Sequence, residues 1–288
     1  MKFDVNPSRT FGVELEIFFT NGLDRYEVAS RLREAGVNIN TEGYNHYVRH
    51  HWKIITDRSI KNSQGRNDLS CMEIVSPPLY GLDGLEEVRK VADELKAMGA
   101  KVNKSCGFHV HHDVRHYGLQ EFKNLYILYT KCEPAMDSLV PLSRRGNKQY
   151  YCQSLRRRNV FDWINNVNSI RDISYKLNRN RYLKLNILSY FKYGTIEFRQ
   201  HSGTIESDKI INWIVFTQAI VNTAAGVKIR VGYCNNDTAE GTMLYLRNVI
   251  TADCRYRTTG CDELVQQAIK FQYKRRRQLN QRQGTRAA

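Results

Sequence analysis

Short segments in which apolar and polar residues alternate constrain the fold of this 288-residue chain more than any other feature. The clearest is FGVELEIFF at residues 11–19, where Val13 and Leu15 share one face of an extended chain and Glu14 and Glu16 share the other. Comparable segments occupy residues 51–57, 71–75, 107–114, 182–188 and 194–201. This pattern is typical of an antiparallel sheet that is covered on one side.

Helical patterns separate these segments. Asp24 and Glu27 have the spacing of a capping box, which predicts a helix over residues 25–35 that ends at Gly36. Apolar residues three or four apart predict further helices over residues 85–98, 119–131 and 207–226. The polar and basic stretch 143–159 is predicted to be a loop, and the tail beyond Tyr273 a frayed helix or a disordered end. The sequence therefore predicts a mixed α+β fold.

Composition limits the class of protein. With 41% hydrophobic residues the chain can bury a sizeable core, and it has no apolar run of the length that spans a bilayer. Seven scattered cysteines without CxxC pairs favour reduced thiols, and the N-terminal MKFDVNPSRT lacks the apolar stretch of a signal peptide, so we expect a cytoplasmic protein without a membrane partner. The net charge of +15 favours anionic partners, and six of its cations lie in the tail from Lys274 to Ala288.

The polar faces of the predicted strands carry unusual residues. His109 and His111 share a face in CGFHVHHDV, Glu197 and Arg199 share one in GTIEFRQHSG, and Glu73 and Asp57 belong to two further segments. The polar face of an antiparallel sheet is often simply solvated. That interpretation weakens with repetition, because solvated faces usually mix Thr, Lys, Ser and Gln, whereas these positions are chiefly Glu, His, Asp and Arg.

Convergence of the four glutamates would require positive charge among them. Two carboxylates about 4 Å apart repel by roughly 4 kcal/mol at an effective dielectric near 20. Glutamate, aspartate and histidine together suit Mg²⁺ or Mn²⁺. A zinc site using Cys106, His109 and His111 is a weaker alternative, because the surrounding carboxylates are too many for a closed tetrahedral centre. Arg199 is either a phosphate ligand or the partner of an ion pair across the sheet, and the chain has neither a GxxxxGK[ST] loop nor a GxGxxG turn.

The ordered set of segments resembles the amidoligase family of the glutamine synthetase and glutamate–cysteine ligase superfamily. The matching segments, from Phe11 to about Ala225, are FGVELE, WKIITDRSI, EIVSPPL, VNKSCGFHVHHD, SRR, RYLKLNI and TIEFRQHSGT. Each segment alone is weak evidence for the family, but the number and order of the segments make the resemblance specific.

The resemblance implies a curved, mainly antiparallel sheet, with ATP and two or three Mg²⁺ or Mn²⁺ ions bound on its concave face and helices on the other face. Carried over position by position, the implied metal ligands are Glu14, Glu16, Glu73, His109 with His111 as the competing choice, and Glu197. Arg199 would contact ATP phosphates, and Arg144 or Arg145 would neutralise the transferred phosphoryl group. Asn186 and Asp57 match cofactor-binding positions whose roles the resemblance does not assign.

The implied activity is ATP-dependent formation of an amide or isopeptide bond between a carboxylate and an amine. Small-molecule, peptide and protein carboxylates all fit this activity, and the resemblance does not distinguish them. We expect a catalytic domain over residues 1–226, a helical extension over 227–273 and the basic tail over 274–288. The alternatives are a nucleic-acid-binding protein that uses the basic tail, and a metal-dependent hydrolase or nuclease that uses the same acidic and histidine residues.

Overall fold

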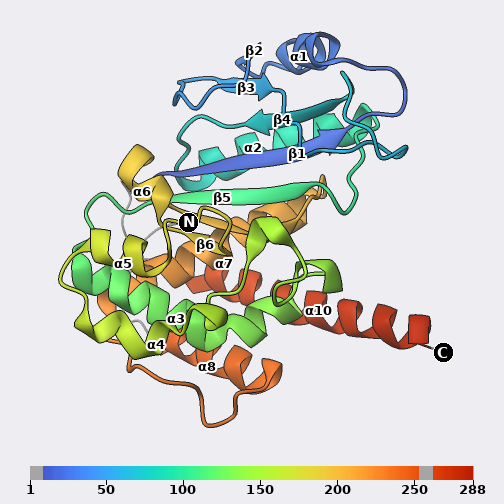
Figure 1. The fold of residues 1–288 in the computed structure, drawn as a ribbon. Coiled ribbons are helices and arrows are strands. Elements are labelled where there is room, and N and C mark those ends of the chain that lie inside the picture. Colours follow the sequence, from blue (N-terminus) through green and yellow to red (C-terminus); the bar gives the residue numbers. More distant parts are fainter. Residues whose placement is uncertain (1–8, 253–261, 288) are drawn as a thin grey trace. The chain divides into compact units, whose positions relative to one another are not determined.

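The computed structural model describes residues 9–252 and 262–287, and Figure 1 shows its mixed helices and strands. The strands are β1 (Phe11–Phe18), β2 (Ile39–Thr41), β3 (Trp52–Ile55), β4 (Cys71–Val75), β5 (Gly107–Asp113), β6 (Leu185–Asn186) and β7 (Thr195–Ser202). The helices are α1 (Arg25–Glu34), α2 (Gly81–Ala97), α3 (Leu119–Ser138), α4 (Val160–Trp163), α5 (Ile170–Lys176), α6 (Leu188–Tyr193), α7 (Ser207–Gly226), α8 (Ala239–Ala252) and α10 (Asp262–Ala287). The predicted α+β class is confirmed.

The described residues form two compact units. The strand-rich unit comprises residues 9–111 and 201–211, and the helix-rich unit comprises residues 112–200, 212–252 and 262–287. The predicted domain boundaries at residues 226 and 273 rest on the family resemblance and on composition, whereas the two units are defined by contacts within the fold. These boundaries stay a prediction. Among the helices of residues 9–252 and 262–287, none combines the length and apolarity needed to cross a bilayer.

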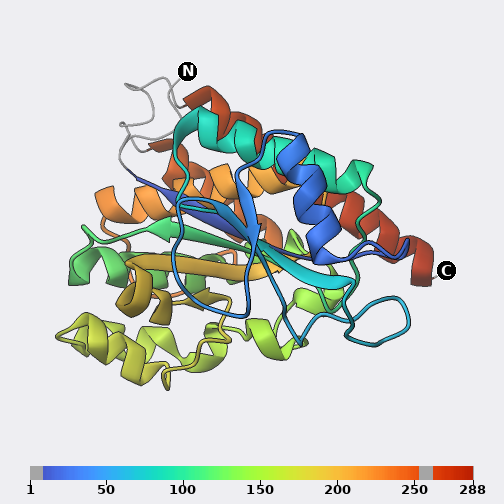
Figure 2. The same cartoon turned by 90° about the horizontal axis from the view of Figure 1, so that it is seen from above.

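In the strand-rich unit the strands follow the order β2-β3-β4-β1-β5. β4 is antiparallel to both β1 and β3, whereas β2 is parallel to β3. Helices α1 and α2 lie on the same face of these strands (Figures 1 and 2). Trp52 belongs to this face, because its indole Nε1 donates to Glu87 Oε1 of α2 at 2.6 Å.

The predicted capping box sets the start of α1. The Asp24 carboxylate accepts from Glu27 N at 3.0 Å, and Glu27 Oε2 accepts from Asp24 N at 3.0 Å. Val28 and Leu32 then turn into the core, where both are fully buried. A local signal thus produced a helix whose apolar side packs as the sequence predicts.

The helix-rich unit is built around α3, which packs against α8 and is buried along most of its length. Two tyrosines of α3 bind the neighbouring strands: Tyr126 Oη donates to Leu185 O at 3.2 Å, and Tyr129 Oη donates to Gln200 Oε1 at 2.6 Å. The helix extends to Ser138, seven residues beyond the predicted end at residue 131. In the same unit, α10 continues as a helix through the predicted basic tail as far as Ala287.

One predicted strand is much shorter than expected. The alternation over residues 182–188 predicts a strand, but β6 is only Leu185–Asn186. The Asn186 side chain accepts from Leu188 N at 2.9 Å, and Ser189 Oγ donates to Asn186 O at 2.9 Å, so the chain turns into α6 instead. Side-chain hydrogen bonds to the local backbone compete with a strand in this way. The stretch 143–159, predicted to be a loop, contains short 3-10 turns at Tyr150–Cys152 and Arg156–Arg158 and the end of a third at Leu142–Arg144.

Candidate functional site

Three adjacent strands of the strand-rich unit bring the predicted acidic and histidine residues together. β1 lies between β4 and β5, and its register places Glu16 directly opposite Glu73. The side chains of these positions point away from the face covered by α1 and α2, because the alternate residues Leu15, Ile74 and Ile54 align with Trp52 on that face. We call Glu14, Glu16, Asp57, Glu73, His109 and His111 the acidic cluster.

Histidine and carboxylate side chains are in direct contact in the acidic cluster. His109 Nδ1 lies 3.0 Å from Glu14 Oε2, and His109 Nε2 lies 3.7 Å from Glu16 Oε1. His111 Nε2 lies 3.3 Å from Glu14 Oε1. The second Glu16 oxygen, Oε2, accepts from Gly107 N at 2.6 Å. His109, Glu16 and Glu73 are buried, so these contacts are shielded from bulk water.

The geometry of the cluster suits a divalent cation. One ligand atom from each of Glu14, Glu73 and His109 lies within 4.8 Å of the other two. The same holds for Glu16, Asp57 and Glu73, so Glu73 belongs to both triads. Donors that bind one octahedral ion at about 2.1 Å lie roughly 3–4 Å apart, so small side-chain movements would bring either triad to that spacing. The oxygen-rich donor set with one imidazole fits Mg²⁺ or Mn²⁺ better than zinc.

The histidines also control the charge of Glu14. Burial alone would raise its pKa, but hydrogen bonds from His109 and His111 and their electrostatic attraction outweigh burial. The pKa of Glu14 is therefore held well below its ordinary value. A carboxylate that stays ionised at neutral pH keeps both oxygens available as metal ligands.

Cys106 does not join this cluster as a ligand. Its thiol packs in an apolar group with Phe18, Ile60 and Cys71, and burial raises its pKa to about 11. Among the described residues, no group of three ligand atoms within 4.8 Å of one another includes the Cys106 thiol. The structure thus gives Cys106 a packing position and weakens the zinc alternative.

Lys53 is a neighbour of the acidic cluster that the sequence does not single out. Although it is nearly fully buried, its Nζ donates to Asn45 Oδ1 at 2.9 Å and to Tyr47 O at 2.9 Å. Burial lowers its pKa, while the carboxylate of Glu42 and, to a smaller extent, those of Glu73 and Glu14 act in the opposite direction. The only sequence signal was a lysine inside the apolar segment WKII, which a surface position would explain equally well.

Glu197 belongs to the helix-rich unit and has its own set of partners. β6 and β7 are antiparallel, with Asn186 opposite Glu197. Asn186 Nδ2 donates to Glu197 Oε2 at 2.7 Å, and Arg199 Nη1 donates to Glu197 Oε1. Arg199 Nε also donates to Tyr151 O at 3.3 Å. Arg199 therefore forms an ion pair, but with Glu197 two residues away on the same strand, which differs from the ion pair across the sheet that the sequence suggested, and its guanidinium is buried.

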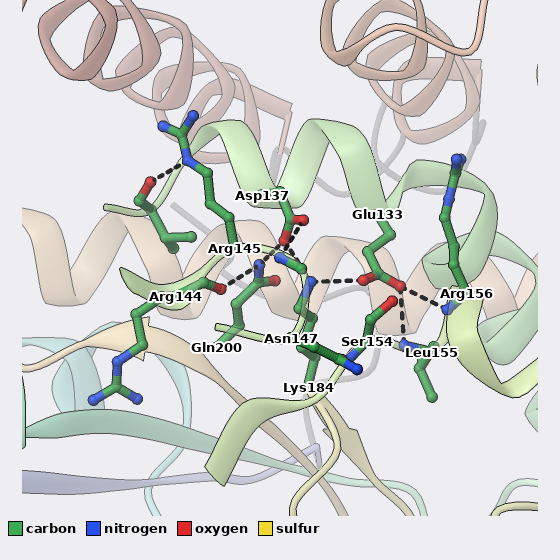
Figure 3. Close-up of polar contacts among 12 residues, drawn as sticks. Glu133, Asp137, Arg144, Arg145, Asn147, Ser154, Leu155, Arg156, Lys184 and Gln200 are labelled. Atoms are coloured by element: carbon green, nitrogen blue, oxygen red, sulfur yellow. Dashed lines mark hydrogen bonds and ion pairs between the residues drawn. The ribbon is translucent and has the colours of Figure 1, made fainter. Parts of the chain in front are cut away.

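The structure separates the two arginines of the SRR segment. Burial raises the pKa of the Cys152 thiol, while the nearby Arg144, Lys184 and Arg199 lower it, so Arg144 and Arg199 flank the same thiol. Arg145 Nε instead donates to Val140 O at 2.9 Å. Figure 3 shows the Arg144 and Arg145 side chains leaving the turn in opposite directions. Arg144, and not Arg145, thus belongs with Asn186, Glu197 and Arg199, which we call the arginine cluster.

Comparison with known proteins gives one family match. The family described as "Putative amidoligase enzyme" matches residues 7–221, which include every member of the acidic and arginine clusters. None of the curated proteins matches this chain. A cryo-EM structure of Plasmodium falciparum glutamine synthetase aligns with 95% of this chain and 73% of its own chain, at 10% identity and a TM-score of 0.39. This structural similarity is too weak to support a conclusion about function. The family match covers most of the chain, and the chain therefore belongs to the amidoligase enzyme family.

Proposed function

We propose that this protein is an ATP-dependent carboxylate–amine ligase that forms an amide or isopeptide bond through an acyl-phosphate intermediate. Family membership supports a ligase of the amidoligase type. The observation that carries the proposal is the acidic cluster, in which two triads of ligand atoms share Glu73. A pair of sites for Mg²⁺ or Mn²⁺ is the arrangement that a triphosphate substrate would use.

In this proposal the acidic cluster holds the metal ions. Glu14, Glu73 and His109 form one site, and Glu16, Asp57 and Glu73 form the other. His111 contacts Glu14 and orients its carboxylate, while remaining the competing histidine ligand. When bound, the divalent ions supply positive charge that offsets the charge of the ATP phosphates during transfer. Glu197 keeps the role of an additional ligand that the family resemblance implies.

The arginine cluster is proposed to bind the phosphates. Arg199 contacts them, with Glu197 and Tyr151 fixing the direction of its guanidinium. Arg144 neutralises the transferred phosphoryl group, because it shares the surroundings of Arg199, whereas the Arg145 guanidinium is bound to Val140 O. Asn186 orients the Glu197 carboxylate. Prepositioned donors of this kind stabilise charge that develops in the transition state.

The reaction takes place in two steps. A substrate carboxylate attacks the γ-phosphorus of ATP, ADP leaves, and the carboxylate becomes an acyl phosphate. An amine then attacks the acyl carbon, inorganic phosphate leaves, and the amine loses a proton as the amide forms. Phosphorylation is needed because oxide is a poor leaving group. The candidate substrates are small-molecule, peptide and protein carboxylates.

The first experiment measures thermal unfolding with Mg²⁺ alone and with Mg²⁺ plus a non-hydrolysable ATP analogue. A ligase should gain several degrees only when both are present, because binding to the folded state stabilises it. Glu73→Gln should lose this gain, and Glu86→Gln, at an exposed position of α2, is the matched control. A full response to metal alone would favour the hydrolase alternative and contradict the proposal.

The second experiment measures turnover. Panels of carboxylates and amines are tested for Mg²⁺-dependent release of ADP and phosphate, and the acyl phosphate is trapped with hydroxylamine as a hydroxamate. We expect trapping to require ATP and a carboxylate but no amine. Hydrolysis of a phosphodiester or peptide in place of ATP would point to the hydrolase or nuclease class instead.

A further inference from the structure

Lys184 is a fully buried lysine in the helix-rich unit, next to the start of β6. Its Nζ lies 2.6 Å from Glu133 Oε1 and 2.5 Å from Asp137 Oδ1. Glu133 and Asp137 are one turn apart on α3, so both carboxylates point toward the same ammonium group (Figure 3). None of these three residues has a role in the proposed chemistry.

The second oxygen of each carboxylate holds the segment that carries Arg144. Glu133 Oε2 accepts from the backbone amides of Leu155 and Arg156, each at 3.0 Å. Asp137 Oδ2 accepts from Gly146 N at 2.8 Å. Both ends of residues 144–156, which we call the arginine segment, are therefore anchored on carboxylates that Lys184 neutralises.

Gln200 extends this network to Arg144 itself. Its Nε2 donates to Asp137 Oδ1 and, at 3.5 Å, to Arg144 O, while its Oε1 accepts from Tyr129. The backbone of Lys184 also takes part, because Arg199 N donates to Lys184 O at 2.9 Å. Lys184 N in turn donates to Gln153 O at 3.0 Å. One residue therefore contacts the strand that carries Arg199 and, through its two carboxylates, the segment that carries Arg144.

The charges of Lys184, Glu133 and Asp137 need partners of opposite charge or hydrogen bonds, because they are largely removed from water. An unpaired carboxylate or ammonium away from water is strongly unfavourable, and a buried polar network favours the single arrangement that satisfies all its members. Glu133, Asp137, Lys184 and Gln200 form what we call the lysine network. Within the described part of the chain, their side chains form hydrogen bonds with one another, with Tyr129 and with the backbone of the arginine segment. Changing the Lys184 charge should therefore alter the order of that segment more than the packing of α3.

We propose that Lys184 is a positioning residue that fixes Arg144 for contact with the transferred phosphoryl group. Lys184 touches no substrate, and it acts by holding Glu133 and Asp137, which hold the arginine segment. The inference rests on the proposed function for the role of Arg144, while the anchoring of the segment stands on the contacts alone.

The test uses two variants, because Lys184→Met alone leaves the buried Glu133 and the partly buried Asp137 without their cation and can prevent folding. The second variant, Lys184→Met with Glu133→Gln, removes one charge of each sign and retains an amide oxygen for Leu155 N and Arg156 N. Lys123→Met is the control, since Lys123 lies on the same helix as Glu133 and Asp137 but is only partly buried, and its Nζ donates to Asn165 O.

Hydrogen exchange of residues 142–158 provides a readout that is independent of activity. We expect at least about a 10-fold increase in exchange in the Lys184 variants, because the anchoring hydrogen bonds open more often, and no increase in Lys123→Met. Unchanged exchange in a folded Lys184→Met, Glu133→Gln protein would overturn the anchoring.

Non-additivity provides the readout that a purely structural role would not give. Arg144→Ala should lower kcat by about 100-fold to 1,000-fold in the wild type but less than about 5-fold in the Lys184→Met, Glu133→Gln background, because the arginine is already misplaced there. Equal effects in both backgrounds would overturn the positioning role. A wild type that shows no ATP-dependent turnover would refute the proposed function, and the exchange measurement would still decide whether Lys184 orders the segment.

Discussion

The acidic cluster and the lysine network are both groups of buried or partly buried carboxylates, but they are neutralised differently. In the lysine network one ammonium contacts both carboxylates within 2.6 Å, and the remaining oxygens accept backbone amides. In the acidic cluster the contacts of Glu14 and Glu16 are with two imidazoles and one backbone amide. The first arrangement is complete as a structural tie, whereas the second gathers donor atoms at the spacing that a metal ion would occupy.

This difference distinguishes a structural group of carboxylates from a candidate metal site, and it does so without using the family match. Glu16 and Glu73 are directly opposite each other on neighbouring strands, an arrangement that destabilises a sheet unless a cation lies between them. Glu133 and Asp137 are spaced by one helical turn and share a lysine. The chain therefore contains one acidic group built for its own lysine and one that we propose is built for an exogenous cation.

We expect the largest effects from Glu133→Gln and Glu73→Gln, which change one carboxylate in the lysine network and one in the acidic cluster. Glu133→Gln should reduce the free energy of unfolding by about 3–5 kcal/mol, because it breaks a buried ion pair. Glu73→Gln should change metal-free stability little, because it removes one of two opposed charges, but it should weaken Mn²⁺ binding by at least about 100-fold. Urea unfolding and metal titration measure the two quantities. Equal losses of stability in both variants would show that both groups of carboxylates stabilise the fold, and would contradict the contrast between them.

The next effect concerns the neighbouring arginines. Arg144→Ala should lower kcat by about 100-fold to 1,000-fold, as expected for the loss of a donor to a developing anion. Arg145→Ala should cost less than about 10-fold, because its guanidinium donates to Val140 O on the other side of the turn. Steady-state kinetics with ATP as the varied substrate checks both. A larger effect at Arg145 would reverse the assignment that the turn geometry favours.

The smallest effect contrasts these buried groups with an ion pair that faces solvent. A hydrogen bond from Arg49 lowers the pKa of Glu42 to about 2 from its ordinary 4.5, assisted by Asn45 and His51 and opposed by partial burial. Because the folded-state pKa is depressed, the stabilising contribution is complete above pH 4.5 and is lost as the pH falls toward 2.

Glu42→Gln should lower the free energy of unfolding at pH 7 by at most about 1 kcal/mol, as expected for an ion pair near the surface, and this difference from the wild type should disappear as the pH falls toward 2. Unfolding by urea at a series of pH values between 2 and 7 measures the difference between variant and wild type. Identical pH profiles would show that the Arg49 contact does not persist in solution.

Much of the fold followed from local sequence signals. Alternation predicted β1, β4, β5 and β7, and the Asp24 capping box predicted the first residue of α1. These features lie in consecutive residues, where side-chain direction is set by the period of the backbone. The same alternation established that Glu14 and Glu16 share a face, so most of the acidic cluster was expected before the strands were placed beside one another.

Other features were decided only by contacts between distant segments. The register that sets Glu16 opposite Glu73, and the placing of Asp57 beside them, depend on strand pairing. The partners of Lys184 lie 51 and 47 residues away along the chain, so no local pattern could reveal a buried lysine network.

Arg144 and Arg145 are adjacent, and the sequence treated them as equivalent. Only the turn, with Gln200 and Val140 on its two sides, distinguishes them. The sequence by itself determined the strands, the helices and which side chains share a face, because these depend on neighbouring residues. Tertiary structure decided which charged groups meet and which cation neutralises them, because burial and pairing arise only when distant segments pack together.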